Sequence, residues 1–347
     1  MKTIINYLLV IFFSLFLVSC GKRITEQEAR QVLSQHLLNK YKEPFHIEYI
    51  GKRSDGKEVW YEAEIYPQKY VGQPQSNDKY YKHKGTVDIK KNIITGESLG
   101  GVGDTYGIIA VNDSANKFYM PKLKELFGEQ VLPVIEVDAG VLHTSYDFIS
   151  TLGLGGYIPV KGGVYIFGRI DSLEEKEKYR KNIFDFIEYM KFTNTFEYVN
   201  LAFYILDERC LTERFETEVG PKLVEARKKL KTSTEFLEYR STLLKELDND
   251  FNKMTKEDKI MKINSFNKNN LLDMWGWDYP KNKLNKYSVM NHKVVRSRKY
   301  LETDLRLHEF KKLDFNNMNE LRLYNTLKVD YDEYDKKKFY NQEWDGE

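Results

Sequence analysis

One serine lies in the spacing that hydrolases use for a nucleophile. Gly96-Glu-Ser98-Leu-Gly100 matches the G-x-S-x-G elbow, in which a sharp strand-to-helix turn exposes the serine hydroxyl. The glycine-rich segment from Gly101 to Gly107 follows, and such a segment is a poor start for the helix that the elbow requires. His143 could complete a triad, but no pattern singles it out. The favoured interpretation of Ser98 is a turn after an edge strand.

The histidines and acidic residues do not show metal-ligand spacing. No two histidines lie four residues apart on an expected helix, and none belongs to an H-E-x-x-H motif. The acidic run from Asp330 to Asp335 lacks the glycine that a calcium-binding loop needs for its sharp turn, so it indicates a solvated face. We therefore expect no metal and no cofactor. The histidines are His36, His46, His83, His143, His292 and His308.

A basic stretch is the strongest candidate for a charged contact. The segment from Lys281 to Tyr300 contains many cations and no acidic residue. Such a stretch could bind anionic lipid headgroups, at about 1 kcal/mol per charge near the surface, or an acidic partner. A solvated face in a lysine-rich chain is the alternative. The residues expected to contact an anionic surface are Lys293, Arg296, Arg298 and Lys299.

The N-terminus resembles the signal peptide of bacterial lipoproteins. An apolar run from Ile4 to Val18 follows Lys2 and is shorter than the ~20 residues that span a bilayer. It ends in Leu17-Val18-Ser19-Cys20, which is similar to a lipobox. The resemblance implies that residues 1–19 are removed and that residues 20–23 form a lipidated tether. The competing interpretations are an ordinary secretory signal and an uncleaved anchor helix.

The lipobox resemblance assigns a role to each residue at the cleavage site. The thiol of Cys20 would accept a diacylglyceryl group, and the small side chain of Ser19 would fit the signal peptidase. Acyl chains such as palmitate contribute roughly 0.8 kcal/mol per buried CH₂, so two or three chains anchor stably. Gly21 stands where an aspartate would favour inner-membrane retention. We therefore expect a lipid-anchored envelope protein, placed in the outer membrane where the organism has two.

Composition limits the other classes of function. The chain has only two cysteines, and with Cys20 lipidated, Cys210 has no disulfide partner. We expect Cys210 to pack as a small apolar residue. The formal net charge of +2 provides no general attraction to nucleic acid.

Residues 24–110 are expected to form one α+β domain. Thr25-Glu-Gln-Glu28 is a capping box, and the helix after it places Ala29, Leu33 and Leu37 on one face. Alternating apolar residues then predict strands, first with Phe45, Ile47 and Tyr49 facing the core, and next near residues 59–66 and 80–89.

This domain resembles the PepSY type. The residues that carry the resemblance are Ile24-Thr-Glu-Gln-Glu-Ala29, Asp55-Gly56, Tyr61-Glu-Ala-Glu-Ile65, Val87-Asp88 and Thr95-Gly96-Glu97. The sequence departs from the family pattern in a long loop from Gln68 to Asn77 and in a spacer from Ile89 to Ile94. The resemblance implies a small cystatin-like sheet on one helix, with inhibitory or protein-binding roles and no family-wide catalytic residues.

Two further regions follow. Residues 111–215 form a second α+β region, with expected strands near 131–137, 164–170 and 196–206. A diverged repeat of the first domain is one interpretation of it. Residues 216–347 form a mainly helical C-terminal region, whose periodicity is too weak after Met254 to predict topology. The fold class is thus α+β, with a helix packed on antiparallel meander sheets, followed by a mainly helical C-terminal region.

These features favour a lipid-anchored binding or structural protein that performs no catalysis. Its partners would be the membrane, through lipid on Cys20, and an envelope protein or anionic lipid. The alternative is an inhibitor or immunity-type protein that blocks a peptidase or toxin. A serine hydrolase that uses Ser98 is the third hypothesis, and its test would be loss of esterase activity on substitution.

Overall fold

The computed structural model describes residues 22–92, 95–138, 146–230, 232–272, 288–297 and 299–300. The chain divides into two units, Met1–Gly107 and Ile108–Glu347. The division near residue 107 lies close to the end of the expected first domain.

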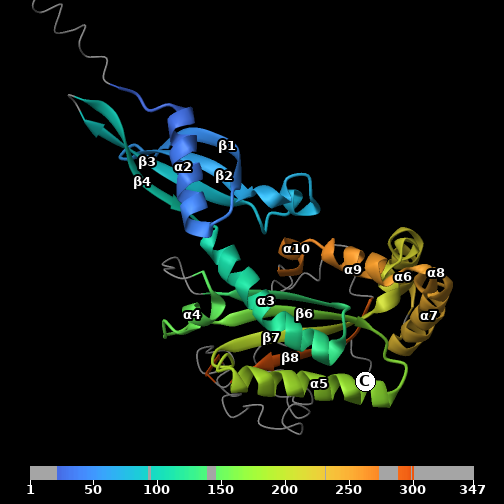
Figure 1. Cartoon of the computed structure of the whole chain (residues 1–347). Coiled ribbons are helices and arrows are strands. Elements are labelled where there is room, and N and C mark those ends of the chain that lie inside the picture. The colour runs from blue at the N-terminus through green and yellow to red at the C-terminus, as the bar shows by residue number, and fades with distance from the viewer. Residues whose placement is uncertain are drawn as a thin grey trace, which may run out of the picture. The chain divides into compact units, whose positions relative to one another are not determined.

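The first unit is one helix on a four-stranded antiparallel meander. Helix α2 (Glu26–Tyr41) precedes β1 (Phe45–Ser54), β2 (Val59–Pro67), β3 (His83–Asn92) and β4 (Gly96–Asp104), and the strands pair in chain order. Two short 3₁₀ turns, η1 (Gln68–Tyr70) and η2 (Pro74–Asn77), join β2 to β3. Figure 1 shows α2 lying along one face of this sheet. The predicted helix-plus-meander arrangement is confirmed.

The core of the first unit forms where α2 faces the sheet. The capping box at Thr25 and Glu28 starts the helix as predicted, and Ala29, Leu33 and Leu37 are fully buried. A Cβ atom on Gly85 of β3 would lie only 2.9 Å from the Leu33 methyl groups. The glycine therefore lets the helix approach the sheet closely.

A β-bulge in β1 changes which of its side chains face the core, so the prediction from strict alternation is wrong for part of this strand. The register with β2 shifts between Ile47 and Tyr49, which leaves Glu48 as the extra residue. Ile50 consequently replaces Tyr49 as the next buried residue, and Tyr49 is 56% exposed. Strict alternation wrongly placed the Tyr49 ring in the core.

The second unit is built on a mixed four-stranded sheet. Its strands are β5 (Val131–Val137), β6 (Val160–Gly168), β7 (Val199–Asp207) and β8 (Val289–Arg296), in that spatial order. The β6–β7 pair is parallel, and both flanking pairs are antiparallel. Gly162 has φ +122°, and a Cβ there would meet the Val134 carbonyl oxygen at 2.1 Å. This topology differs from the meander, so the second region is not a repeat of the first.

Helices bury both faces of this sheet. Helices α3 (Gly107–Phe127) and α5 (Leu173–Phe192) share one core cluster with Val164 and Ile166 of β6. Tyr165 and Phe167 point to the opposite cluster. Its helical residues come from α6 (Gly220–Lys229), α7 (Ser233–Lys245), α8 (Asp248–Lys253), α9 (Lys256–Asn264) and α10 (Lys268–Leu272). A short helix α4 (Phe148–Leu152) precedes β6.

The expected boundary at residues 215 and 216 does not separate two units. Strand β8 belongs to the predicted C-terminal region, yet it pairs along β7 from Asn200 to Leu206. The helices from α6 onward also cover a face of the sheet that the preceding region supplies. Residues 111–215 and the described residues after 216 therefore belong to one unit, although the C-terminal part is mainly helical as predicted.

Truncation of Leu33 tests the contact between α2 and the sheet. Leu33→Ala should lower the free energy of unfolding of the first unit by about 2–5 kcal/mol, because it opens a cavity over Gly85. Hydrogen exchange of the β2 and β3 amides measures this unit separately from the second.

Gln31→Ala is the matched control, because Gln31 is exposed on the same helix. It should change stability by less than about 0.5 kcal/mol. Lys40, which also lies off the apolar stripe, is unsuitable as a control because its ammonium pairs with Asp104 at 2.7 Å. Equal protection in the two variants would show that α2 does not dock through Leu33.

Candidate functional site

Several of the predicted site residues lie outside the described residues. These are Ser19, Cys20 and Arg298, together with the side chain of Lys293. The described chain begins at Lys22, two positions after the predicted lipidation site. There the Lys22 carbonyl accepts a hydrogen bond from the Glu97 N–H at 2.6 Å. The first described residue is thus bonded to β4.

The other two basic residues of the predicted anionic-surface contact, Arg296 and Lys299, lie in different environments. Arg296 is 8% exposed, and its Nε donates to Asn200 Oδ1 at 3.0 Å, at the end of the β7–β8 ladder. Lys299 pairs with the exposed carboxylate of Glu197. The prediction that Arg296 contacts an anionic surface is therefore wrong, because strand pairing takes its guanidinium into the unit.

Ser98 does not have the geometry of a nucleophile elbow. It lies inside strand β4, opposite Lys90 of β3, and this strand continues to Asp104. The next helix, α3, begins only at Gly107. The elbow needs a strand, a strained turn and a helix in immediate succession. The expected turn at Ser98 is also replaced by extended strand.

The described residues include no group of three or more His, Cys, Asp or Glu side chains that could hold a metal ion. Among the same residues, no helix is both long and apolar enough to cross a membrane. Cys210 is buried as expected, and burial raises the pKa of its thiol well above the ordinary value.

A buried carboxylate organises one end of the first unit. The Asp104 side chain is wholly buried and accepts hydrogen bonds from Lys40 Nζ at 2.7 Å and from Tyr41 OH at 2.6 Å. His36 Nε2 lies 3.2 Å from the same carboxylate, and the Tyr106 N–H donates to it at 3.0 Å. Burial alone would raise the pKa of Asp104, but the bonds from Lys40 and Tyr41 outweigh it and lower the pKa.

Sequence reasoning missed this cluster because its parts are far apart in the chain. His36 precedes Asp104 by 68 residues and Lys40 precedes it by 64. A usable signal existed, since His36 and Lys40 lie at i and i+4 beside the apolar stripe of α2. A polar pair in that position can face a buried acid.

A groove on the first unit is a candidate binding surface. Its volume is about 490 Å³, and its lining comes from β1, β2, the start of β3 and Lys82 just before β3. Lys82 lies between Glu48 and Glu64, at 2.6 Å and 2.8 Å, and Lys84 pairs with Glu62 at 3.2 Å. The full lining is Glu48, Tyr49, Glu62, Ala63, Glu64, Lys82, His83 and Lys84.

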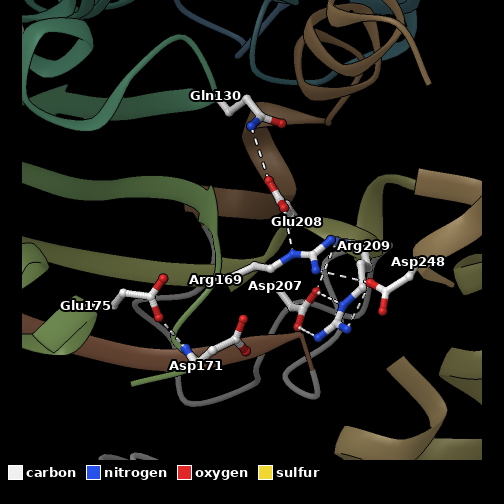
Figure 2. Close-up of polar contacts among 8 residues, drawn as sticks. All are labelled: Gln130, Arg169, Asp171, Glu175, Asp207, Glu208, Arg209 and Asp248. Atoms are coloured by element: carbon white, nitrogen blue, oxygen red, sulfur yellow. Dashed lines mark hydrogen bonds and ion pairs between the residues drawn. The ribbon is translucent and has the colours of Figure 1, made fainter. Parts of the chain in front are cut away.

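A second charge cluster lies at the carboxyl ends of β6 and β7. Because these strands are parallel, Arg169 after β6 and Asp207 at the end of β7 reach the same edge of the sheet. Figure 2 shows Arg169 donating to Glu208 at 2.7 Å and pairing with Asp248 of α8 at 3.1 Å. Asp248 also pairs with Arg209 at 3.3 Å. The cluster fastens the helical layer to the sheet.

Two buried arginines near this cluster, Arg209 and Arg240, differ in their hydrogen-bond partners. The guanidinium of Arg209 meets Asp207 in a bidentate pair at 2.8 Å and 2.7 Å, with both side chains buried. Arg240 of α7 is also buried, but its Nε and Nη2 have no acceptor in the described part of the chain. Burial lowers the pKa of Arg240 to about 10.

Comparison with known proteins identifies no family. No protein-family model and no curated protein matches the chain. One solved structure, the crystal structure of a DUF5037 family protein from Ruminococcus gnavus ATCC 29149, is similar at 13% identity over 51% of this chain and 75% of that chain. The TM-score is 0.28, and a likeness this weak supports no conclusion about fold or function.

Neutralising Asp104 should destabilise the first unit in a pH-dependent way. At neutral pH, Asp104→Asn should lower the free energy of unfolding by about 1.5–3 kcal/mol, because hydrogen bonds to a charged acceptor are lost. The folded pKa lies below the unfolded value of about 3.9. The carboxylate therefore stabilises fully above that pH, and this contribution is lost as pH falls through the folded pKa.

Denaturation of wild type and variant across this pH range measures the difference, with hydrogen exchange assigning it to the first unit. Glu58→Gln, at an exposed position beside the β1–β2 turn, should change stability by less than about 0.5 kcal/mol. A difference between wild type and Asp104→Asn that does not shrink below pH 4 would contradict the role of the ionised carboxylate.

The two buried arginines should respond oppositely to replacement by methionine. Arg209→Met leaves Asp207 buried without its partner and should destabilise the second unit by about 3–5 kcal/mol. Arg240→Met removes a poorly paired buried charge and should be neutral or stabilising, by up to about 4 kcal/mol. Hydrogen exchange of the β7 amides is the measurement. Equal losses in both variants would show that Arg240 has an acceptor beyond the described residues.

Proposed function

We propose that this chain is a lipid-anchored protein of the bacterial cell envelope that binds another envelope protein and catalyses no reaction. The proposed anchor is lipid on Cys20, in the outer membrane where two membranes exist. Support for the anchor comes from the lipobox-like Leu17 to Cys20 and from the attachment of Lys22 to β4. A folded unit that begins beside the cysteine suits a protein held at a surface.

The groove on the first unit is the observation that carries the binding role. Within this unit α2 covers one face of the sheet, while Glu48, Tyr49, Glu64 and Lys84 are exposed in the groove. An exposed tyrosine beside charged side chains offers apolar area and hydrogen-bonding groups together, as binding surfaces commonly do.

The charges of the groove favour a protein partner over a small ion. Its lining contains three carboxylates and two ammonium groups, and each ammonium already pairs with a carboxylate. Burial lowers the pKa of His83, which favours its neutral form. A surface of alternating charge selects a partner whose charges alternate in the opposite sense, because like charges at close range exclude other partners.

An inhibitor or immunity-type protein is the second candidate. The helix on a four-stranded meander is the arrangement that the PepSY resemblance implied, and inhibitory roles are proposed for that family. The same groove would then bind a peptidase or toxin. Identification of the bound protein separates this candidate from a structural role.

Photo-crosslinking in cells tests the binding role. A photoreactive phenylalanine analogue in place of Tyr49 should yield a discrete adduct with another envelope protein, because this exposed side chain lines the groove beside the bulge of β1. Lys82→Glu in the same chain should greatly reduce the adduct, since it places three carboxylates together. Immunoblots and mass spectrometry of the adduct are the measurements.

The matched control places the same analogue at Tyr239 on α7, which is 40% exposed in the second unit. It should not give the Tyr49 adduct. The binding role of the groove is refuted if Tyr49 gives no adduct, or if both positions give the same one in equal yield.

A further inference from the structure

The N-terminal segment of the described chain is held against the end of the sheet. The Lys22 carbonyl accepts from the Glu97 N–H at 2.6 Å, and the Ile24 N–H donates to Glu97 Oε2 at 3.0 Å. The Tyr61 hydroxyl donates to the Ile24 carbonyl at 2.8 Å, in a buried position. The Lys52 ammonium bonds the other oxygen of Glu97 at 2.8 Å. The chain from Lys22 onward therefore has little freedom to swing away from the unit.

The antiparallel topology fixes which parts of the first unit share this end. The start of α2, the β1–β2 turn at Asp55 and Gly56, and the β3–β4 hairpin beside Asn92 and Gly96 all lie with Lys22. The end of β4 and the β2–β3 connection, which includes Lys79, lie at the opposite end. We call the first of these the anchored end and the second the distal end.

Covalent reach then limits the distance between lipid and protein. The Cα atoms of Cys20 and Lys22 are separated by at most about 7 Å, even in a fully extended chain. The polar headgroup layer of a bilayer is itself about 5–8 Å thick on each side. A lipid on the Cys20 thiol would therefore bring the anchored end into contact with the headgroups.

We propose that the anchored end of the first unit is a membrane-contact surface, so that the strands of its sheet stand away from the bilayer. This inference rests on the proposed lipidation of Cys20 and specifies how the anchored unit is oriented. Lys57 in the β1–β2 turn and Lys91 at the end of β3 are exposed there and face the headgroups.

The short tether, more than net charge, determines this orientation. Exposed cations at the anchored end are interspersed with Asp55 and Glu58, and Lys52 is already paired with Glu97. Their attraction to an anionic surface is therefore modest. The contact should persist on vesicles of neutral lipid, in contrast to a surface held by basic residues alone.

The proposed orientation also determines how far the groove lies from the lipid headgroups. From Asn92 at the anchored end to Lys84 in the groove lining, β3 rises about 26 Å at ~3.3 Å per residue. The groove would thus stand clear of the headgroup layer, where a protein partner can reach it. A partner that lies flat in the headgroups could not.

Quenching by a short-range quencher on the lipid headgroups tests the orientation. The full chain, purified with its lipid from cells fed a palmitate analogue, is placed in neutral vesicles that contain a quencher-labelled headgroup. A dye is attached at Lys57→Cys, Lys91→Cys or Lys79→Cys, because Cys20 would be acylated and Cys210 is buried. The dyes at positions 57 and 91 should be strongly quenched, and the dye at position 79 should not.

Two controls keep the inference separate from the anchor itself. Insertion of 20 Gly and Ser residues between Gly21 and Lys22 adds a flexible reach of about 25 Å and should remove the difference between positions. Equal quenching at all three positions with the native tether would overturn the orientation while leaving the anchor intact. The Cys20→Ser variant should carry no palmitate label and should not float with vesicles. If the wild-type chain behaves in the same way, the proposed lipid anchor is refuted, and the orientation with it.

Discussion

The parallel pairing of β6 with β7 imposes the architecture of the second unit. Parallel neighbours need a crossover connection, and α5 supplies it between them. Strands in such a pair are apolar on both sides, and in β7 every residue except Tyr204 is buried. A second helical layer must therefore cover the face that α3 and α5 leave bare. Helices α6 to α10 form that layer, and β8 closes the edge of β7.

The sheet of the first unit needs less cover than that of the second. An antiparallel meander needs a covering layer on only one face, and α2 is sufficient for that. Polar side chains can then occupy the other face, as Glu64 and Lys84 do opposite one another. The bulge at Glu48 turns Tyr49 to the same side. Helices cover both faces of the sheet in the second unit, whereas in the first unit one face of the sheet keeps exposed polar side chains.

Local signals predicted much of this fold, and long-range pairing explains what they missed. The capping box at Thr25 and the apolar runs of β6 and β7 need only neighbouring residues, and both were found. Strand β4 is rich in glycine, and its strand conformation depends on pairing with β3 rather than on its own propensity. Strand β8 pairs with residues far upstream, along β7. No local pattern could identify Asp104 as the acceptor for Lys40, because the register of β4 places it there.

The same distinction separates the polar groups that serve folding from those open to a partner. A buried charge needs its counter-charge within reach before any ligand arrives, because desolvation otherwise exceeds the gain from pairing. Asp104 with Lys40 meets this condition, and so does Asp207 with Arg209. The pairs of the groove are more exposed, so water can replace either partner at little cost. An incoming protein can therefore exchange the bonds of Lys82 and Lys84 without disturbing the core, and this makes the groove the better candidate for recognition.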